Sequence, residues 1–153
     1  MRDKKKSKIL SIDSYRSMLM AVYVNIVTAD GHPSAEQEGS IVNQLNLNPL
    51  FANYDTEIQI DELLSSYLKD HANEASKLYE SITKYNSSMS HYEKITLIDM
   101  ALKAILADGI ISAQEDKVFR QIHAAVNIED EILLSYFPYI SNLIVSDFKT
   151  NTR

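Results

Sequence analysis

Two long apolar stretches organise the chain, and each is expected to form a helix. Residues 17–29 carry no charged side chain, and apolar side chains recur there at helical spacing on nearly every face. The second stretch, 95–105, repeats this spacing and carries Asp99 and Lys103 four residues apart as an exposed ion pair. A helix that is apolar almost all round is a buried one, so the two helices are expected to pack together at the centre of the fold.

Each apolar stretch leads into the same turn. Ala29-Asp30-Gly31 is repeated as Ala107-Asp108-Gly109, 78 residues later, and Ser and Ala follow at matching places in both copies. Glycine tolerates the left-handed backbone at a helix end, so Gly31 and Gly109 are expected to stop the two apolar helices.

A capping box is expected to start the helix after each turn. Ser34 is followed three residues later by Gln37, and Ser112 is followed at the same distance by Glu115. In such a box the serine hydroxyl accepts a hydrogen bond from a backbone N–H of the first turn, and the Gln or Glu side chain accepts one from the serine N–H. One helix-turn-helix unit is therefore used twice.

The remaining elements complete an all-α prediction. Only 3 Gly and 3 Pro occur in 153 residues, too few for the turns of an all-β protein, and no strand is predicted. We expect helical segments capped at Asp13, Asn48, Asp61 and Ser90, a helix through 75–82, a loop at 86–88, and a last pair of segments, 132–137 and 139–148, split at Pro138. The predicted fold is a compact bundle of about seven helices built from two related helix-turn-helix halves.

A single helical domain, residues 13–148, is expected between two tails. Its pseudo-repeats cover about 13–52 and 90–137, and either half alone would have a very small core. Residues 149–153 are expected to form one tail. Residues 1–12 are expected to form the other, which is basic and flexible and contains Arg2, Lys4, Lys5, Lys6 and Lys8.

Composition and charge exclude several functions. The chain has no Cys, which excludes disulfides and thiolate metal sites, and its net charge of −6 argues against a general nucleic-acid-binding surface. Asp13 and Arg16 adjoin the first apolar stretch and Asn25 interrupts it, which argues against a signal peptide. The stretch is also shorter than the roughly 20 apolar residues that span a bilayer. We expect a cytoplasmic protein without membrane insertion.

The aspartate in each turn raises the question of chemistry. A carboxylate at the negative end of a helix dipole is mildly unfavourable, so another interaction should offset it. One candidate is a divalent cation such as calcium, magnesium or manganese, with oxygen ligands from Asp30, Glu38, Asp108 and Glu115. The other is structural, because an aspartate can accept hydrogen bonds from nearby N–H groups and lock its turn. An ordinary EF-hand is excluded, since Ala104 would occupy the first ligand position of its loop.

The doubled pattern of an apolar helix, Ala-Asp-Gly, and then Ser-x-x-Glu opening another helix resembles the TerB family of tellurite-resistance-associated proteins. The same domain occurs at the front of DjlA-type membrane co-chaperones. The resemblance covers residues 13–148 and implies a cytoplasmic all-α domain without known catalysis, whose paired acidic residues are proposed to bind divalent metal in stress-response systems. Carried over by motif, these residues are Asp30, Asp108 and Glu115.

The first copy departs from the family pattern at one place. Gln37 stands where the second copy has Glu115, and the nearest acid, Glu38, lies one residue on and about 100° round the helix. A glutamine oxygen is a neutral ligand. The resemblance therefore implies a weaker cation site in this chain, or none.

Three functions follow from the sequence. The preferred one is a non-enzymatic TerB-like module in a stress-response or adaptor role, with another protein as its partner and weak divalent-cation binding at the paired turns. The alternative is a purely structural protein–protein interaction domain with no metal site. An enzyme with Asp30 and Asp108 as a carboxylate pair is the least favoured, because it needs a cleft between the two acids. Nucleophilic catalysis has no support, since there is no Cys and no G-x-S-x-G motif, and the four His residues are too scattered for a zinc site.

Overall fold

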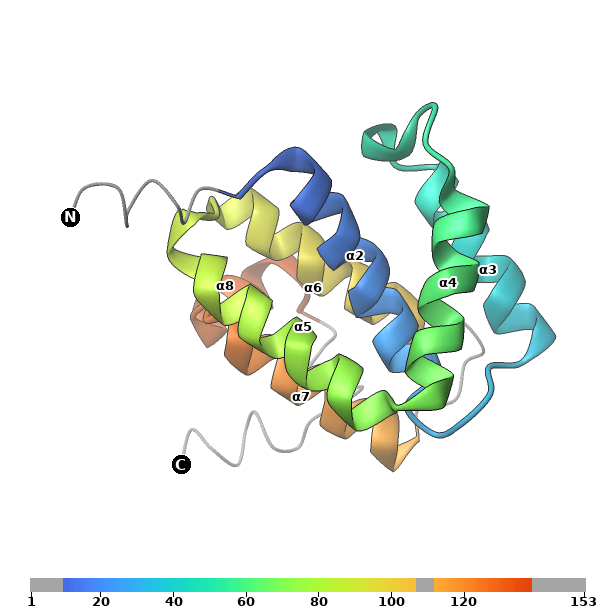
Figure 1. The fold of residues 1–153 in the computed structure, drawn as a ribbon. Coiled ribbons are helices and arrows are strands. Elements are labelled where there is room, and N and C mark those ends of the chain that lie inside the picture. Colours follow the sequence, from blue (N-terminus) through green and yellow to red (C-terminus); the bar gives the residue numbers. More distant parts are fainter. Residues whose placement is uncertain (1–9, 107–111, 139–153) are drawn as a thin grey trace.

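Helices make up the regular structure of the described part of the chain, which is residues 10–106 and 112–138 of a computed structural model (Figure 1). No strand occurs in these residues. In chain order the helices are α2 (Ile12–Val27), α3 (Ala35–Asn46), the 3-10 helix η1 (Pro49–Phe51), α4 (Thr56–Lys69), α5 (His71–Tyr85), the 3-10 helix η2 (Asn86–Ser88), α6 (His91–Ile105), α7 (Ala113–Val126) and α8 (Asp130–Tyr136). The prediction of an all-α bundle of about seven helices is confirmed.

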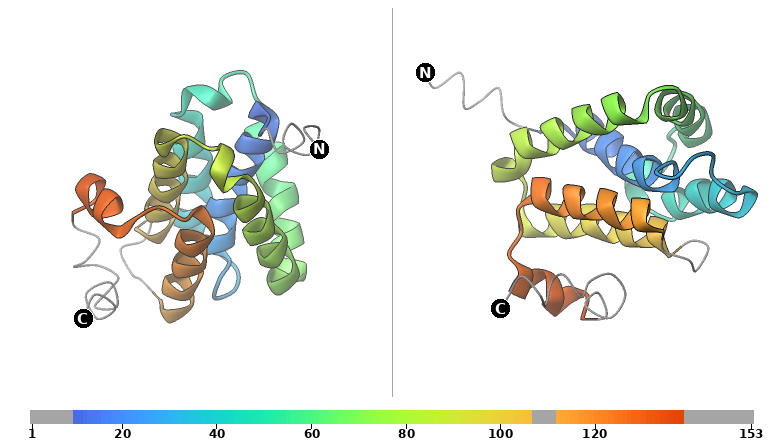
Figure 2. Two further views of the ribbon diagram at one scale, coloured as in Figure 1. Left: turned by 90° about the vertical axis from the view of Figure 1, so that its left-hand side faces the viewer. Right: turned by 90° about the horizontal axis from the view of Figure 1, so that it is seen from below.

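The two apolar helices, α2 and α6, lie side by side at the centre, as predicted (Figure 2). Eleven of the 16 residues of α2 are buried, and all of them lie at or after Tyr15. The second half of the helix therefore has almost no exposed face. Both helices start at a serine N-cap, which is Ser11 in α2 and Ser90 in α6. The starts are tied together where the Tyr15 hydroxyl donates a hydrogen bond to the Glu93 carbonyl oxygen at 2.7 Å.

Equivalent positions of the two copies meet at both ends of this central pair. Tyr15 and Glu93 are 78 residues apart, which is the offset of the sequence repeat. The same offset separates Gln37 and Glu115, whose side chains are hydrogen bonded at the starts of α3 and α7. A residue contacts its own equivalent when both lie beside the axis that relates the copies, so the two halves are arranged about a pseudo-two-fold axis.

The outer helices cover the central pair. α3 packs on α4, and both contact α2 on one side of the molecule (Figure 1). α5 packs against α2, α4 and α7, while α7 also packs on α6 and α2. The chain then continues into α8, which buries Leu133 and the following Phe137. The buried residues of both halves join in one hydrophobic cluster.

The predicted start of the first helix is wrong by two residues. Ser11 is the N-cap, and its Oγ accepts a hydrogen bond from the Ser14 N–H at 3.1 Å. Asp13 lies inside the first turn, where it forms an ion pair with Arg16 at 2.9 Å. Ser11 is the N-cap in place of Asp13 because its backbone is extended, and its hydroxyl can therefore reach a free N–H group of the first helical turn.

The predicted start of α4 at Asp61 is also wrong. The helix begins at Thr56, because its buried stripe already starts there; the stripe consists of Thr56, Ile60, Leu64 and Tyr67. The expected loop at 86–88 is the short helix η2, held where the Asn86 side-chain amide donates to the Ala125 carbonyl oxygen at 3.1 Å.

Other local predictions are confirmed. Asn48 caps η1 by accepting a hydrogen bond from the Leu50 N–H at 3.0 Å, with Pro49 at the first helical position. Asp99 and Lys103 form the expected ion pair at 2.8 Å on the surface of α6. The segment 139–148 lies outside the described residues.

The pseudo-symmetry predicts a matched pair of stability losses. Leu19 of α2 and Leu97 of α6 occupy equivalent positions, and both are fully buried. Leu19→Ala and Leu97→Ala should each lower the free energy of unfolding by about 2–5 kcal/mol, the usual cost of a cavity in a packed core. Chemical denaturation measures both.

Leu47→Ala is the control for this pair, because Leu47 is 79% exposed and its truncation should change the free energy of unfolding by less than about 0.5 kcal/mol. A loss at only one of the two buried leucines would contradict the symmetric packing.

Candidate functional site

The first repeated turn joins α2 to α3 through a backbone shape that needs glycine. α2 ends at Val27, and the Thr28 hydroxyl donates a hydrogen bond back to the Val24 carbonyl oxygen at 2.6 Å. Two residues after the turn's Ala29, Gly31 has a φ of +119°, which side chains other than hydrogen rarely permit. The prediction that Gly31 ends the helix is therefore wrong, because α2 stops at Val27 with Thr28 as its C-cap, and Gly31 shapes the turn that follows. Gly109, its counterpart, lies outside the described residues.

Both predicted capping boxes are present. In the first, the Ser34 N–H donates to Gln37 Oε1 at 2.9 Å and the Gln37 N–H donates to Ser34 Oγ at 3.1 Å. In the second, the Ser112 N–H donates to Glu115 Oε1 and the Glu115 N–H donates to Ser112 Oγ, both at 3.0 Å. Each box satisfies two donors at the start of α3 or α7.

The two boxes face each other across the pseudo-two-fold axis. Gln37 is 6% exposed and Glu115 is 2% exposed, and Gln37 Nε2 donates to Glu115 Oε2 at 3.5 Å. Gln37 therefore uses its oxygen for its own cap and its nitrogen for the other half of the molecule. Glu115 likewise uses one carboxylate oxygen for its own cap and the other for Gln37.

The predicted cation ligands do not all join this buried pair. Glu115 is part of it, whereas Asp30 and Glu38 are exposed. Glu38 points away because it lies one residue beyond the buried Gln37 on the helix. Asp108 lies outside the described residues. Within residues 10–106 and 112–138, no three His, Asp or Glu side chains are grouped so that they could hold a metal ion.

The chemistry of Gln37 does not fit a tight cation site. A cation between the boxes needs oxygen ligands from both of them, but the second box is met by an N–H donor, which a cation repels. Gln37 would have to turn its oxygen away from the Ser34 N–H to become a ligand. In the described residues, the amide of Gln37 takes the position that a cation would need.

The locking role suggested for the aspartate is not observed in the first turn. The Asp30 carboxylate accepts no hydrogen bond from any described residue, and the turn is closed by backbone contacts such as Gly31 N–H to the Thr28 carbonyl oxygen at 3.2 Å. The lock between the halves is instead the pair Gln37 and Glu115. Their common offset of 78 was the available signal, because it marks them as equivalents.

A buried polar cluster lies beneath the end of α2, and the sequence did not single it out. Asn25 is fully buried, and its Nδ2 donates to the Tyr79 hydroxyl at 3.1 Å. His71 Nε2 lies 2.9 Å from the Asn25 carbonyl oxygen, so this nitrogen carries the hydrogen. Burial raises the pKa of Tyr79, and the hydrogen bond from Asn25 partly opposes that rise. The cluster ties α2 to α5.

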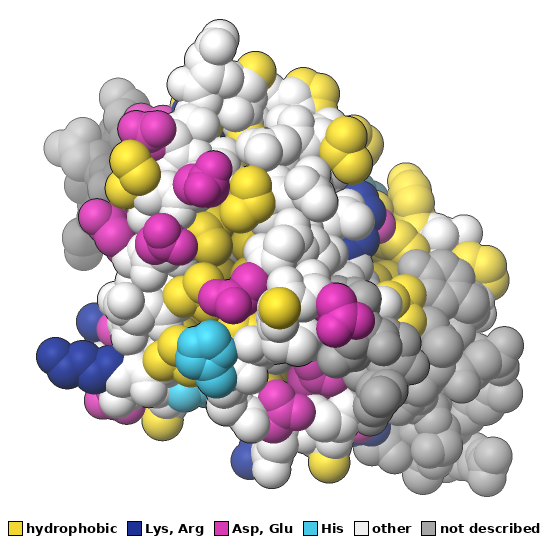
Figure 3. Space-filling view, turned by 90° about the vertical axis from the view of Figure 1, so that its right-hand side faces the viewer, with side chains coloured by type: hydrophobic (Ala, Val, Ile, Leu, Met, Phe, Trp, Pro, Cys, Tyr) yellow, Lys and Arg dark blue, Asp and Glu magenta, His cyan; other side chains and the backbone are white. Residues whose placement is uncertain are grey.

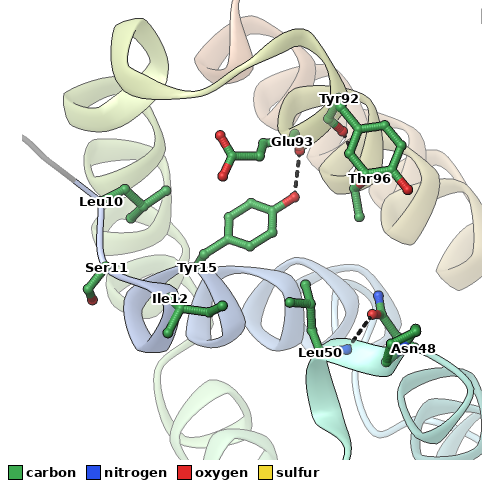
Figure 4. A pocket seen from close by; sticks show the side chains of 10 residues that line it. Leu10, Ser11, Ile12, Tyr15, Asn48, Leu50, Tyr92, Glu93 and Thr96 are labelled. Atoms are coloured by element: carbon green, nitrogen blue, oxygen red, sulfur yellow. Dashed lines mark hydrogen bonds between the residues drawn. The ribbon is translucent and has the colours of Figure 1, made fainter.

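A cavity of about 420 Å³ opens at the opposite end of the central pair (Figure 4). It lies between the first turns of α2 and α6 and the helix η1, whereas the repeated turns follow the other ends of α2 and α6. Its lining is mainly apolar. The Tyr15 hydroxyl is bonded to the Glu93 backbone, and the Glu93 carboxylate accepts from the Ser90 N–H at 2.9 Å, so both polar groups hold the helix starts. The described residues that line the cavity therefore include no pair of side chains placed for acid–base chemistry.

Comparison with protein families decides what kind of module this is. The family model described as "Tellurite resistance protein TerB" matches residues 16–133. The chain belongs to the TerB family. The match spans both copies of the turn, most of α2 and all of α6, so the resemblance inferred from the doubled motif is confirmed. No curated protein and no solved structure matches the chain.

The helices of this TerB-family chain were also compared with the requirements of a membrane span. In the part of the chain that the structure describes, none is both long enough and apolar enough to cross a bilayer.

The junction predicts an asymmetric response to charge. Gln37→Glu should lower the free energy of unfolding by about 1–3 kcal/mol, since it replaces the donor with a second buried carboxylate. The loss should be larger at pH 8 than at pH 5, because a protonated carboxyl can donate in place of the missing amide. Thermal or chemical denaturation at both pH values measures it.

The matched control combines Gln37→Glu with Glu115→Gln, which again places one amide against one carboxylate. This double variant should recover most of the stability lost in Gln37→Glu. Equal instability of the single and double variants would contradict the direct interaction between the two side chains.

Proposed function

We propose that this TerB-family chain is a non-enzymatic adaptor in a stress response, acting in the cytoplasm by binding another protein. The observation that carries the proposal is the buried bond between Gln37 and Glu115. It gives the acid of the second repeat a structural task, joining the two halves. The turns thus support a rigid scaffold, and the scaffold acts through its outer surfaces.

The chemistry of the site supports a binding role over catalysis. A general acid or base must reach a substrate, but Glu115 is buried and hydrogen bonded to both capping boxes. Asp30 is exposed in the first turn without a described hydrogen-bond partner to tune it. Asp108, the other member of the carboxylate pair considered for an enzyme, lies outside the described residues, so that pair stays untested.

Cation binding stays a second, weaker proposal. Glu115 is the ligand on which it would depend, with Asp30, Glu38 and Asp108 as the remaining acids. Its support is the buried carboxylate at the meeting point of the two repeats. The amide of Gln37 opposes it, so any divalent cation should be bound weakly and should not be required for folding.

The adaptor role is tested in the organism that encodes the chain. A tagged full-length chain, cross-linked in cells with and without tellurite stress, should recover a specific partner protein. Recovery should persist in an Asp30→Asn, Asp108→Asn variant, because the acids of the turns are not the adaptor surface. The absence of any specific partner under both conditions would overturn the role.

Calorimetry predicts how much Gln37 controls cation binding. The wild-type chain should bind calcium, magnesium, manganese or zinc no more tightly than about 0.1 mM, the range of weak oxygen-ligand sites. Gln37→Glu should bind more tightly and regain thermal stability on adding cation, since the cation would then separate two carboxylates. Micromolar binding by wild type that is lost in Asp30→Asn, Asp108→Asn would show that the amide does not prevent a site.

A further inference from the structure

The charges of the chain are strongly segregated. Residues 17–68 contain no Lys or Arg and seven acids, so this segment carries more negative charge than the whole chain, whose net charge is −6. The acids are Asp30, Glu36, Glu38, Asp55, Glu57, Asp61 and Glu62, and every one of them is exposed. None forms an ion pair with a described residue.

Five of these acids lie on α3 and α4, which pack together at one side of the bundle, and Asp55 is the N-cap residue of α4. Figure 3 views the molecule from that side, and acidic side chains are spread over it with hydrophobic ones between them. Few Lys and Arg side chains are visible in this view, at its left and lower edges and in a patch right of centre. An acidic surface of this kind repels nucleic acid and anionic membranes and attracts cationic partners.

The outer face of α4 adds a pattern that charge alone does not explain. Ile58 is 54% exposed and Leu68 is 40% exposed, although both are large and apolar. With Asp61 and the small Ser65 they form a stripe at spacings of three, four and three residues, which we call the outer seam. This is the spacing at which one helix packs along another.

The outer seam is separate from the face of α4 that packs in the bundle. The inward face buries Ile60, Leu64 and Tyr67, which contribute to the core. All four residues of the outer seam are exposed. Two apolar positions therefore stand at the ends of a seam whose middle is acidic, with Glu62 beside it.

We propose that the outer seam of α4 docks a Lys- and Arg-rich amphipathic helix of the partner protein. Its apolar residues pack on Ile58 and Leu68, and its basic residues pair with Asp61 and Glu62. Ser65 leaves room for close approach at the middle. The proposal rests on the adaptor role and names the surface and the chemistry that the role uses.

The test uses a synthetic amphipathic peptide of Leu and Lys, about 18 residues long so that it can form a helix. Calorimetry with the full chain should show binding that weakens as salt is raised. Asp61→Asn with Glu62→Gln should raise Kd about fivefold to twentyfold, the effect of two exposed ion pairs. Ile58→Ser with Leu68→Ser should raise Kd to a similar extent.

Two controls separate this surface from general attraction to an acidic protein. Glu80→Gln with Glu131→Gln makes the same change of charge at exposed sites away from α4 and should alter Kd less than about twofold. A scrambled peptide of the same composition should bind at least about tenfold more weakly, because its apolar residues no longer line one face.

Amide NMR shifts locate the bound peptide and should cluster on α4. Equal weakening by both acid pairs, equal binding of the scrambled peptide, no binding, or shifts confined to the cavity near Tyr15 and Tyr92 would each overturn the proposal. None of these results removes the adaptor role, which fails only when cross-linking in cells finds no partner.

Discussion

The hydrogen bond between Gln37 and Glu115 is the constraint on which the arrangement of the two halves depends. Each side chain completes the cap of its own helix with one polar atom and is hydrogen bonded to the other half of the molecule through another. A buried polar group left without a partner costs more than the net gain of a typical hydrogen bond. The pair therefore fixes how α3 and α7 meet, in addition to the less specific packing of the core.

The same bond shows how a sequence repeat becomes an asymmetric structure. Two identical carboxylates at this position would repel each other, and two amides would each keep an unused polar atom. One Gln and one Glu make a donor and an acceptor, which a perfect two-fold repeat could not provide. The opposite end of the axis is asymmetric as well, because the Tyr15 hydroxyl bonds to the Glu93 backbone.

Features set by local sequence were predictable, and features set by contact between the halves were not. The central helices followed from apolar spacing, and the caps at Ser34 and Ser112 followed from residues three positions apart. The start of α4 was misjudged because Thr56 is a polar residue that tertiary packing buries. The role of Gln37 was only half visible, since the sequence shows its neutrality and marks Glu115 as its equivalent, but equivalence in a repeat does not by itself predict contact.

The charge segregation has a similar origin in the fold. A long run without Lys or Arg would be an unremarkable feature of an extended chain, but the helix pair α3 and α4 gathers most of its acids on one side of the molecule. The bundle thus separates an interior, where Gln37 is bonded to Glu115 and Asn25 to Tyr79, from an exterior where seven acids have no ion-pair partner among the described residues.

The amide at position 37 has a consequence for how the protein experiences its surroundings. A fold closed by a cation would have a stability that rises and falls with the free concentration of that cation, by mass action. Here the buried Glu115 carboxylate is bonded to the side-chain N–H of Gln37, which belongs to the same chain. In the scaffold proposed above, the shape would then not depend on the supply of a cation or on chelators, whereas a fold closed by a cation would respond to both.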